Sequence, residues 1–451
     1  MRILFLTQIV PYPPDAGPRI KTWNVLRYLA NCGHSITLAT FIREDEREHL
    51  APLLEICSNV FTVPIHRSRI SDIGYFLRSL ISGRPFLLER DDMKGMRSLV
   101  SRLLKNEEFD YIHADQLTMT QFALQTLTTS NNAQVQNLNV SYRNGSLDVN
   151  RAQILTNKER PVLVFDAHNA VWTIVERMRE RMPFYTHPLL NIEARRVKAF
   201  EGMIVQKFDH TLAVSEIDRQ DLLKALDAYV RSSLSIKETI SASSDSDKGQ
   251  ITVIPIAVDT IRLRPITRRQ DSFNILTLGT LQYPPNVDGI RWFVGEVFPL
   301  IYQQIATATL TIIGKNPPQD ILRLEAKDPT RIKVTGYVDD LVPYFEETAV
   351  IVVPVNAGSG MRVRILEAFA RAMPVVTTSV GLEGIEAELG EDVLVADSPD
   401  DFAKAVVRLL QDEDLRDQLA NNGRHLAETL YDWRVSLRKL NHIYENDERI
   451  I

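Results

Sequence analysis

Short apolar runs rich in β-branched residues alternate with longer stretches of helical periodicity along most of the chain. The runs are continuously apolar rather than alternating, which indicates strands that are covered on both faces. Strand–helix alternation of this kind predicts an α/β fold built from parallel, doubly wound sheets. Six strands are predicted in each half of the chain, at residues 3–6, 35–40, 60–63, 111–113, 162–166, 211–214, 274–278, 309–313, 333–336, 350–354, 375–378 and 393–395.

The length of 451 residues predicts two domains, because one hydrophobic core rarely serves so long a chain. We expect a Rossmann-like domain at 1–260 and a second Rossmann-like domain at 261–432. A terminal helix at 433–451 is expected to pack on one of them, with the N-terminal domain as the candidate. Polar stretches near 128–160 and 232–249 predict surface insertions.

Composition excludes several classes of protein. The formal net charge of −6 argues against nucleic acid as a partner. Only two cysteines, Cys32 and Cys57, are present, so neither a disulfide framework nor a structural zinc is expected, and a reducing cytosol fits. The apolar start at Met1–Val10 is interpreted as a buried strand rather than a signal peptide, and no run is apolar enough to predict a membrane-spanning helix.

The stretch GSGMRVRILEAFARAMPVV, residues 358–376, follows a predicted strand and opens a predicted helix. Gly358 and Gly360 let backbone N–H groups approach an anion, and a helix N-terminus adds partial positive charge. Arg362 and Arg364 carry the fork geometry that suits phosphate, and Glu367 could accept hydrogen bonds from a ribose. The stretch matches neither a dinucleotide-binding fingerprint nor a P-loop. An alternative stays open: a tight turn followed by a helix with an Arg364–Glu367 ion pair.

Polar residues also follow predicted strands in the first half, where ligands of parallel sheets bind. His168 lies just after the strand at 162–166, and His113 and Asp115 end the strand at 111–113. Gly17 and Arg19 follow the first strand, where the arginine could reach an anion. Each of these residues also has a purely structural interpretation, in capping, packing or a stiffened loop.

The block Gly336–Glu386, which contains the GSG stretch, resembles the donor-binding region of glycosyltransferase family 4. Ile275–Ile301 and Leu310–Pro318 resemble the first strands of that donor domain, and residues 1–41 resemble the start of its acceptor domain. The resemblance implies the GT-B fold, in which two Rossmann-like domains face each other across a cleft. It further implies retaining transfer of a sugar from a nucleoside diphosphate sugar to a hydroxyl acceptor.

The resemblance also assigns roles to residues. It implies a catalytic set of His168, Arg362 and Glu367. The implied donor-binding set is Gly279, Asn286, Gly336, Gly358, Ser359, Gly360, Met361, Arg362, Arg364 and Glu367. Gly17, Arg19, His113 and Asp115 are expected on the cleft or acceptor side. The segment Ile254–Asp259 resembles the stretch that joins the two domains of the family and is interpreted as a hinge.

The sequence departs from the family at two places in the donor site. Ser359 stands where the first of two glutamates is usual, and the loop Gly279–Asn286 lacks the usual arginine and lysine. Arg362 and Arg364 are the expected replacements, as in a branch with a GSGxRxK/RxLEA motif found among surface-polysaccharide sugar transferases. Two other functions stay open: a non-catalytic nucleotide-sugar-binding protein, and a nucleotide-sugar epimerase, although no carboxylate suited to proton abstraction is found.

No metal or cofactor is expected, and the donor is expected to be a UDP- or GDP-linked sugar. The acceptor would be a glycan, a lipid-linked molecule or a small molecule. Arg67–Lys105 is basic and amphipathic, which fits either peripheral contact with a membrane or ordinary surface helices with buried apolar faces. The expected location is the cytoplasm, including the inner face of the plasma membrane.

Overall fold

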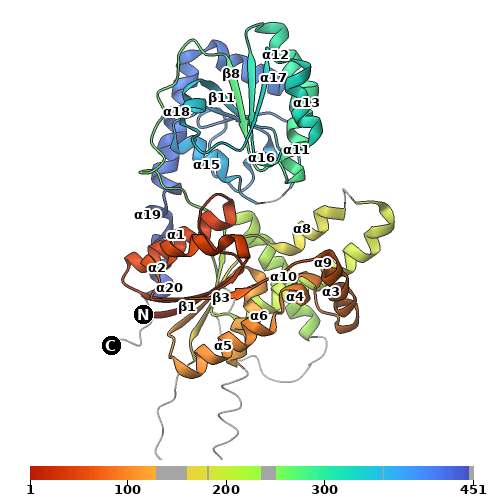
Figure 1. The fold of residues 1–451 in the computed structure, drawn as a ribbon, viewed down its shortest axis with the longest axis vertical. Coiled ribbons are helices and arrows are strands. Elements are labelled where there is room, and N and C mark those ends of the chain that lie inside the picture. Colours follow the sequence, from red (N-terminus) through yellow and green to blue (C-terminus); the bar gives the residue numbers. More distant parts are fainter. Residues whose placement is uncertain (128–159, 180–181, 235–249, 359, 446–451) are drawn as a thin grey trace, which may run out of the picture. The chain divides into compact units, whose positions relative to one another are not determined.

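The computed structural model describes residues 1–127, 160–179, 182–234, 250–358 and 360–445 (Figure 1). The expected insertions lie almost wholly outside these residues, and Ser359 lies outside them too. The chain divides into two compact units. Unit 1 takes the described residues of Met1–Ala213, Arg219–Val253 and His442–Ile451, and unit 2 takes Val214–Asp218 and Ile254–Asn441.

Unit 1 is built on a seven-stranded parallel sheet with strand order β3-β2-β1-β4-β5-β6-β7. Leu4 and Leu6 of β1 belong to one hydrophobic core, while Ile3 and Phe5 are fully buried as well, so both faces of the sheet are covered. The six strands predicted in this half are present, and β7 was not predicted. The strands are β1 (Arg2–Thr7), β2 (Ser35–Ile42), β3 (Asn59–Pro64), β4 (Tyr111–Asp115), β5 (Val162–Asp166), β6 (His210–Ala213) and β7 (Ile251–Val253).

Helices connect and cover these strands. Tyr444, near the end of the described chain, is fully buried in unit 1, and its ring centroid lies 4.8 Å from that of Tyr111 on β4. The helical segments are α1 (Gly17–Asn31), η1 (Glu44–Leu50), α2 (Ala51–Ile56), α3 (Arg69–Ser82), α4 (Phe86–Asp91), α5 (Lys94–Asn106), η2 (Leu117–Met119), α6 (Thr120–Ala123), α8 (Val171–Met178), η4 (Phe184–Thr186), α9 (His187–Lys207), α10 (Glu216–Leu234) and α20 (Asn441–Tyr444).

Unit 2 is built on a six-stranded parallel sheet with strand order β10-β9-β8-β11-β12-β13. Its strands are β8 (Asn274–Leu278), β9 (Thr309–Ile313), β10 (Ile332–Gly336), β11 (Thr348–Val353), β12 (Val375–Thr377) and β13 (Leu394–Val395). Its helical segments are α11 (Pro284–Trp292), η5 (Phe293–Val297), α12 (Phe298–Gln304), α13 (Gln319–Lys327), α14 (Val342–Glu346), α15 (Val363–Ala370), α16 (Ser379–Leu382), α17 (Pro399–Gln411), α18 (Glu413–Leu426), η6 (Ala427–Tyr431), α19 (Trp433–Ser436) and η7 (Leu437–Leu440). All six predicted strands are present, so two parallel α/β domains are confirmed.

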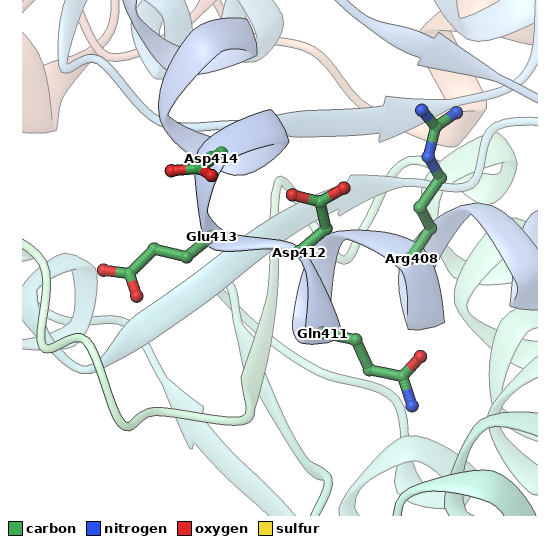
Figure 2. A pocket seen from close by; sticks show the side chains of 5 residues that line it. All are labelled: Arg408, Gln411, Asp412, Glu413 and Asp414. Carbon is green, nitrogen blue, oxygen red and sulfur yellow. The ribbon is translucent and has the colours of Figure 1, made fainter.

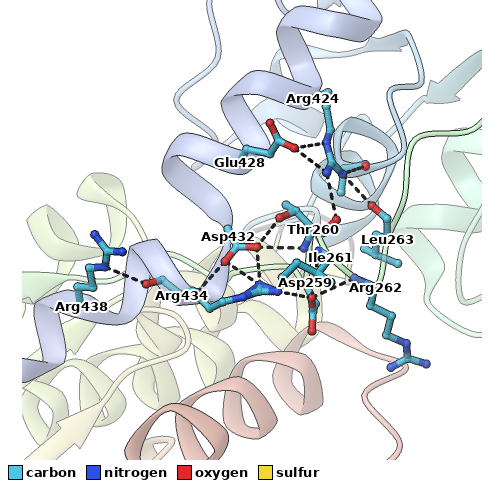
Figure 3. A network of polar contacts seen from close by, with 11 residues as sticks. Asp259, Thr260, Ile261, Arg262, Leu263, Arg424, Glu428, Asp432, Arg434 and Arg438 are labelled. Atoms are coloured by element: carbon cyan, nitrogen blue, oxygen red, sulfur yellow. Dashed lines mark hydrogen bonds and ion pairs between the residues drawn. The ribbon is translucent and has the colours of Figure 1, made fainter. Parts of the chain in front are cut away.

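The segment that follows β7 is fastened to the last helices of unit 2 by a polar network (Figure 3). Asp432 accepts hydrogen bonds from the backbone N–H and the hydroxyl of Thr260, and Arg434 bridges Asp432 and Asp259 at 2.9 and 2.6 Å. Arg424 donates to the carbonyl oxygens of Thr260 and Leu263 at 3.1 and 2.8 Å. The expected hinge segment therefore ends in residues that are held within unit 2.

Among the described residues, no helix combines the length and the apolar character needed to cross a bilayer.

Candidate functional site

Both sheets reverse their strand order at one place, and this is where open parallel sheets bind ligands. In unit 1 the reversal lies between β1 and β4, and in unit 2 it lies between β8 and β11. The carboxyl ends of these strands carry most of the polar residues singled out in the sequence. Each unit is therefore described at its own reversal point.

In unit 1, strand register places three polar side chains in one row. Thr7 of β1 lies beside Asp115 of β4, and Asp115 lies beside Asp166 of β5. All three are fully buried. The Thr7 hydroxyl donates to Asp115 Oδ2 at 2.6 Å, and the Thr22 hydroxyl of α1 donates to the same oxygen at 3.0 Å. These three side chains thus form a buried acidic cluster at the carboxyl ends of three central strands.

Two histidines complete this cluster. His168, in the loop after β5, bonds through Nε2 to Asp115 Oδ1 at 2.7 Å. His113 Nε2 lies 3.4 Å from Asp166 Oδ2, and its Nδ1 bonds to the Tyr444 hydroxyl at 2.6 Å. The structure therefore brings His113, Asp115 and His168 together, and Asp115 fixes one edge of the His168 ring, which aims its other edge away from the carboxylate.

Lys21 supplies the positive charge of the cluster. Its side chain is only 2% exposed, and its ammonium pairs with the Asp166 carboxylate. Burial acts to raise the pKa of Asp166, but Lys21, His113 and His168 outweigh it, so this pKa lies well below its usual range. Lys21 thus keeps Asp166 charged at a buried position where an unpaired carboxylate would destabilise the fold.

His113, Asp115 and Asp166 are also grouped closely enough to offer three ligand atoms to a metal ion, all within 4.8 Å of one another. Three of the four carboxylate oxygens are already engaged: Asp166 Oδ1 by Lys21, and the two oxygens of Asp115 by Thr7, Thr22 and His168. Asp166 Oδ2 and His113 Nε2 have no hydrogen-bond partner among the described residues. A buried ammonium ion beside a candidate metal site nevertheless opposes a second cation, so the cluster fits a charge network neutralised by Lys21 better than a metal centre.

Gly17 and Arg19 lie at the start of α1. Gly17 is the first residue of this helix. The Arg19 guanidinium pairs with Asp15 at 3.0 Å and with Glu46 at 2.7 Å. These two carboxylates neutralise it locally, so the structure supports a role for Arg19 in fastening the loop after β1 to η1.

In unit 2, the segment between β11 and α15 turns through two glycines with left-handed backbone. Gly358 has φ +120° and Gly360 has φ +84°, values that residues with a Cβ rarely adopt. Met361 and Arg362 follow, each only 7–8% exposed, and α15 begins at Val363. Six of the eight residues of α15 are buried, so this helix belongs to the interior of unit 2.

Arg364 reaches back from α15 to the end of β8. Its Nη1 donates to the Leu278 carbonyl oxygen at 2.8 Å, and its Nη2 donates to Asn286 Oδ1. A Cβ on Gly279 would lie 2.3 Å from Arg364 Nη1, so a larger residue here would have to displace the guanidinium. Burial, reinforced by the neighbouring Arg362, lowers the pKa of Arg364 to about 10.

Glu367 lies one turn further along α15 and is partly buried. The Arg364–Glu367 ion pair of the alternative interpretation is not formed, because the guanidinium bonds to Leu278 and Asn286 instead. No donor among the described residues hydrogen-bonds to the Glu367 carboxylate. Burial raises the pKa of Glu367, against the opposing charges of Arg371, Arg262 and Arg364. It is therefore a partly desolvated carboxylate that can still accept hydrogen bonds from a ligand.

The other predicted donor residues are also placed. Gly336 ends β10 with φ +72°. Asn286 is 7% exposed and donates to the Thr280 carbonyl oxygen at 3.0 Å, so with Arg364 it is satisfied within the protein. Pro284 and Pro285 open α11, which removes two of the N–H groups that a helix start usually offers to an anion. The start of α15 is thus the better anion site of the two.

The helix α15 is supported from behind by α18. A Cβ on Gly423 would lie 2.7 Å from the Phe369 ring, so α18 packs directly on α15. Arg424 donates to the carbonyl oxygen of Ala370, the last residue of α15, which also suits the helix dipole.

A separate pocket lies where α17 meets α18 and is lined by Arg408, Gln411, Asp412, Glu413 and Asp414 (Figure 2). None of these residues belongs to the expected donor site. Three of the five are acidic, which suits neither a diphosphate nor any other anion.

Sequence reasoning did not find Lys21, Thr7 or Tyr444 as members of the unit 1 cluster. Lys21 lies among the buried residues Ile20, Thr22 and Val25 of α1. A lysine on the buried side of a helix is a signal for a buried acid elsewhere, since a charge is rarely buried unpaired. Nothing local in the sequence pairs Tyr444 with His113, which lies 331 positions away.

Comparison with known proteins extends these observations. Residues 272–412 match the family model described as "Glycosyl transferases group 1". An uncharacterized 44.6 kDa protein in the cps region of Klebsiella pneumoniae is 22% identical over 96% of both chains. Sucrose-phosphate synthase from Thermosynechococcus elongatus superposes with a TM-score of 0.62, at 16% identity over 99% of this chain and 98% of that one. The Anabaena protein HepE, in complex with UDP, gives a TM-score of 0.62 at 12% identity, over 99% of this chain and 100% of the other.

The structural likenesses show that the two parallel α/β domains have the GT-B fold. The family match, which covers the sheet that carries α15, supports a glycosyltransferase.

Proposed function

We propose that the protein is a retaining glycosyltransferase of family 4 that takes a sugar from a UDP-linked donor and transfers it to a hydroxyl group in the synthesis of a surface polysaccharide or cell-envelope glycan. The observation that carries this proposal is the start of α15, where two left-handed glycines, a buried arginine and a partly desolvated glutamate follow β11. The UDP complex of HepE supports the choice of nucleotide, and the cps-region relative supports the pathway class.

Each residue has a role in donor binding. The backbone N–H groups around Gly358 and Gly360, together with the guanidinium of Arg362, hold the diphosphate. Arg364 adds positive charge behind them while it fixes the end of β8. Glu367 accepts hydrogen bonds from the ribose hydroxyls, which orients the nucleotide.

The chemistry exchanges one bond at the anomeric carbon for another. The bond from this carbon to the diphosphate oxygen breaks, and a bond to the acceptor oxygen forms on the same face. The acceptor proton passes to the departing phosphate. The chief catalytic requirement is to stabilise the charge that develops on the diphosphate, which the α15 amides and Arg362 meet without reorganising. Asp115 and Asp166 are both fully buried and engaged by other side chains, so neither is assigned as a covalent nucleophile.

His168 contacts the donor sugar in this proposal. Its Nε2 is engaged by Asp115, so the Nδ1 edge is the one available to a sugar hydroxyl. Asp115 acts on the ligand through His168 and is a positioning residue.

A thermal-shift panel with UDP, GDP, ADP and TDP tests the proposal, followed by measurement of donor hydrolysis with UDP-sugars. We expect UDP to raise the midpoint of unfolding more than the other nucleotides, because ligand binding to the folded state stabilises it. Slow release of UDP from a UDP-sugar is expected as well. If no nucleotide binds, the assignment of α15 is wrong, and binding without hydrolysis or transfer would favour a non-catalytic sugar-nucleotide-binding protein.

A further inference from the structure

While Phe76 of helix α3 in unit 1 packs on Phe86 with ring centroids 6.2 Å apart, five other large apolar side chains of this helix face solvent. At 3.6 residues per turn, these positions fall within an arc of roughly 120°. They are Ile70, Ile73, Leu77, Leu80 and Ile81, which are 84%, 62%, 54%, 43% and 89% exposed. The only buried residue of the helix is the polar Ser79.

The helix itself is well defined at both ends. Ser68 caps its first turn by accepting a hydrogen bond from the backbone N–H of Ser71, and Gly83 ends it with φ +73°. A surface helix normally turns its apolar stripe toward the core. Here the five exposed side chains face outward, so the greater part of the apolar face of α3 is left uncovered by the described chain.

Helix α9 extends this apolar surface. The Ser79 carbonyl oxygen accepts a hydrogen bond from Arg196 at 3.2 Å, which places α9 beside α3 (Figure 1). Leu189 and Ile192 lie two turns and one turn before Arg196, respectively, on the same side of α9, and they are 38% and 46% exposed. The turn η4, just before α9, exposes Phe184 and Tyr185 at 82% and 72%.

Positive charge surrounds the apolar side chains. Residues 67–97 contain six arginines and one lysine against four acidic residues, and residues 177–198 contain five arginines and one lysine against two glutamates. The chain as a whole is acidic, with a net charge of −6. The ion pairs here also point outward: Arg78 is 60% exposed, whereas its partner Glu89 is 1% exposed. In this ion pair the arginine is therefore exposed to solvent while the carboxylate is buried.

We propose that the exposed face of α3, with η4 and the adjoining face of α9, docks on the surface of an anionic lipid bilayer. Apolar side chains flanked by arginine are the composition of helices that lie in the plane of a membrane interface. Acidic lipid headgroups complement the surrounding charge. A second copy of the chain fits less well, because a symmetric contact would bring the same positive charges together. This docking does not depend on the proposed transfer reaction. Its consequence is that unit 1 lies at a lipid surface.

Co-sedimentation of the full chain with lipid vesicles tests the docking surface. One set of vesicles is made of phosphatidylcholine alone, and the other of equimolar phosphatidylcholine and phosphatidylglycerol. The test variant combines Ile70→Ser, Leu77→Ser and Ile81→Ser, all at exposed positions. The matched control combines Leu54→Ser, Leu322→Ser and Leu389→Ser, which are exposed elsewhere at 61%, 43% and 63%.

The unchanged protein is expected to sediment with the anionic vesicles much more than with the neutral ones, and less at high salt. The test variant should partition roughly 100-fold more weakly, because three apolar side chains no longer enter the interface. The control should bind like the unchanged protein. Equal binding by test variant and unchanged protein, or no binding to anionic vesicles, would overturn the proposal.

A second measurement separates insertion from charge attraction alone. An Ile73→Trp variant is mixed with vesicles that contain brominated acyl chains, and its fluorescence is compared with that of the unchanged protein. Extra quenching is expected, since the new indole would sit among the acyl chains. No extra quenching overturns insertion of this face. A dimer that light scattering detects for the unchanged protein, and that the triple test variant dissociates, would show that a second copy covers the face instead.

Discussion

Replacing Glu367 with glutamine distinguishes a ligand-binding glutamate from a structural one. The first predicts a higher midpoint of unfolding for the variant, and the second predicts a lower one. Burial raises the pKa of Glu367 above its ordinary value of 4.5. A raised pKa means that the folded state binds the proton more tightly than the unfolded state. The stability that this group contributes is therefore complete below the unfolded pKa and is lost as the pH rises through the folded pKa.

At pH 7 the ionised Glu367 carboxylate is thus a cost that glutamine does not carry. Removing this charge should raise the free energy of unfolding by about 1 kcal/mol. For a domain of this size, that raises the midpoint of unfolding by roughly 2–4 °C. The difference between Glu367→Gln and the unchanged protein should shrink as the pH falls toward 4.5. A purely structural glutamate predicts the reverse, since its removal would lower the midpoint.

Nucleotide binding should change in the other direction. A hydrogen bond to a charged acceptor contributes about 1.5–3 kcal/mol, so Glu367→Gln should weaken UDP binding roughly 10- to 150-fold. Calorimetric titration measures this with UDP and with 2′,3′-dideoxy-UDP, which lacks the ribose hydroxyls. The variant and the unchanged protein should bind the dideoxy nucleotide about equally.

Glu388→Gln is the matched control, because it removes the same charge from an exposed position in unit 2. It should leave both the unfolding midpoint and UDP binding unchanged. Equal UDP affinities of Glu367→Gln and the unchanged protein would exclude a ribose contact for Glu367. A loss of affinity as large for the dideoxy nucleotide as for UDP would exclude it as well.

Three further predictions follow from individual contacts. Gly279→Ala should displace the Arg364 guanidinium and destabilise the fold by about 1–3 kcal/mol in thermal unfolding, whereas Gly295→Ala, where a Cβ meets no atom within 4 Å, should not destabilise it; equal midpoints for the two variants would contradict the packing described. Tyr444→Phe removes the 2.6 Å hydrogen bond to His113 and should cost about 1–3 kcal/mol in urea unfolding, and a cost near zero would show that His113 finds another partner. Asp432→Ala removes one of the two carboxylates paired with Arg434 and leaves the buried Thr260 donors without their acceptor, so it should cost about 1–3 kcal/mol in the same assay, and a change near zero would count against the network.

The strands were predictable because parallel sheets bury both faces, which leaves continuous apolar runs in the sequence. All twelve predicted strands are present in the two sheets. The strand β7 escaped because it has three residues, only one of which is buried, so no apolar run marks it. A continuous apolar run in the sequence indicates a strand that is buried on both faces, and a short strand at the edge of a sheet is not buried in this way.

The positions of the singled-out residues along the strands were predictable, but their partners were not. Glycines and charged residues expected after strands do lie there in the structure. The partners lie far apart in sequence: Lys21 and Asp166 are separated by 145 positions, and Arg364 and Leu278 by 86. Such contacts depend on strand order, which local periodicity does not encode.

Helix α3 shows a different limit of sequence reasoning. Its amphipathic pattern was legible, and one interpretation gave it a buried apolar face, which is wrong. The neighbouring α5 does bury Met96, Leu99 and Val100. Periodicity identifies an apolar face but does not reveal whether protein or another apolar phase covers it.

The position of Arg364 changes what the missing basic residues of the Gly279–Asn286 loop imply. That loop carries no cation, and Pro284 and Pro285 deprive α11 of two N–H donors. Arg364 nevertheless places a guanidinium at this loop, since its two Nη groups bond to the Leu278 carbonyl oxygen and to Asn286. A charge carried by α15 thus lies at the end of β8. A lysine could not reproduce it, because a single ammonium on a flexible stem lacks the planar fork that spans two acceptors. The glycine at 279 and the arginine at 364 therefore form one unit, in which the absence of a Cβ makes room for the charge that the loop itself lacks.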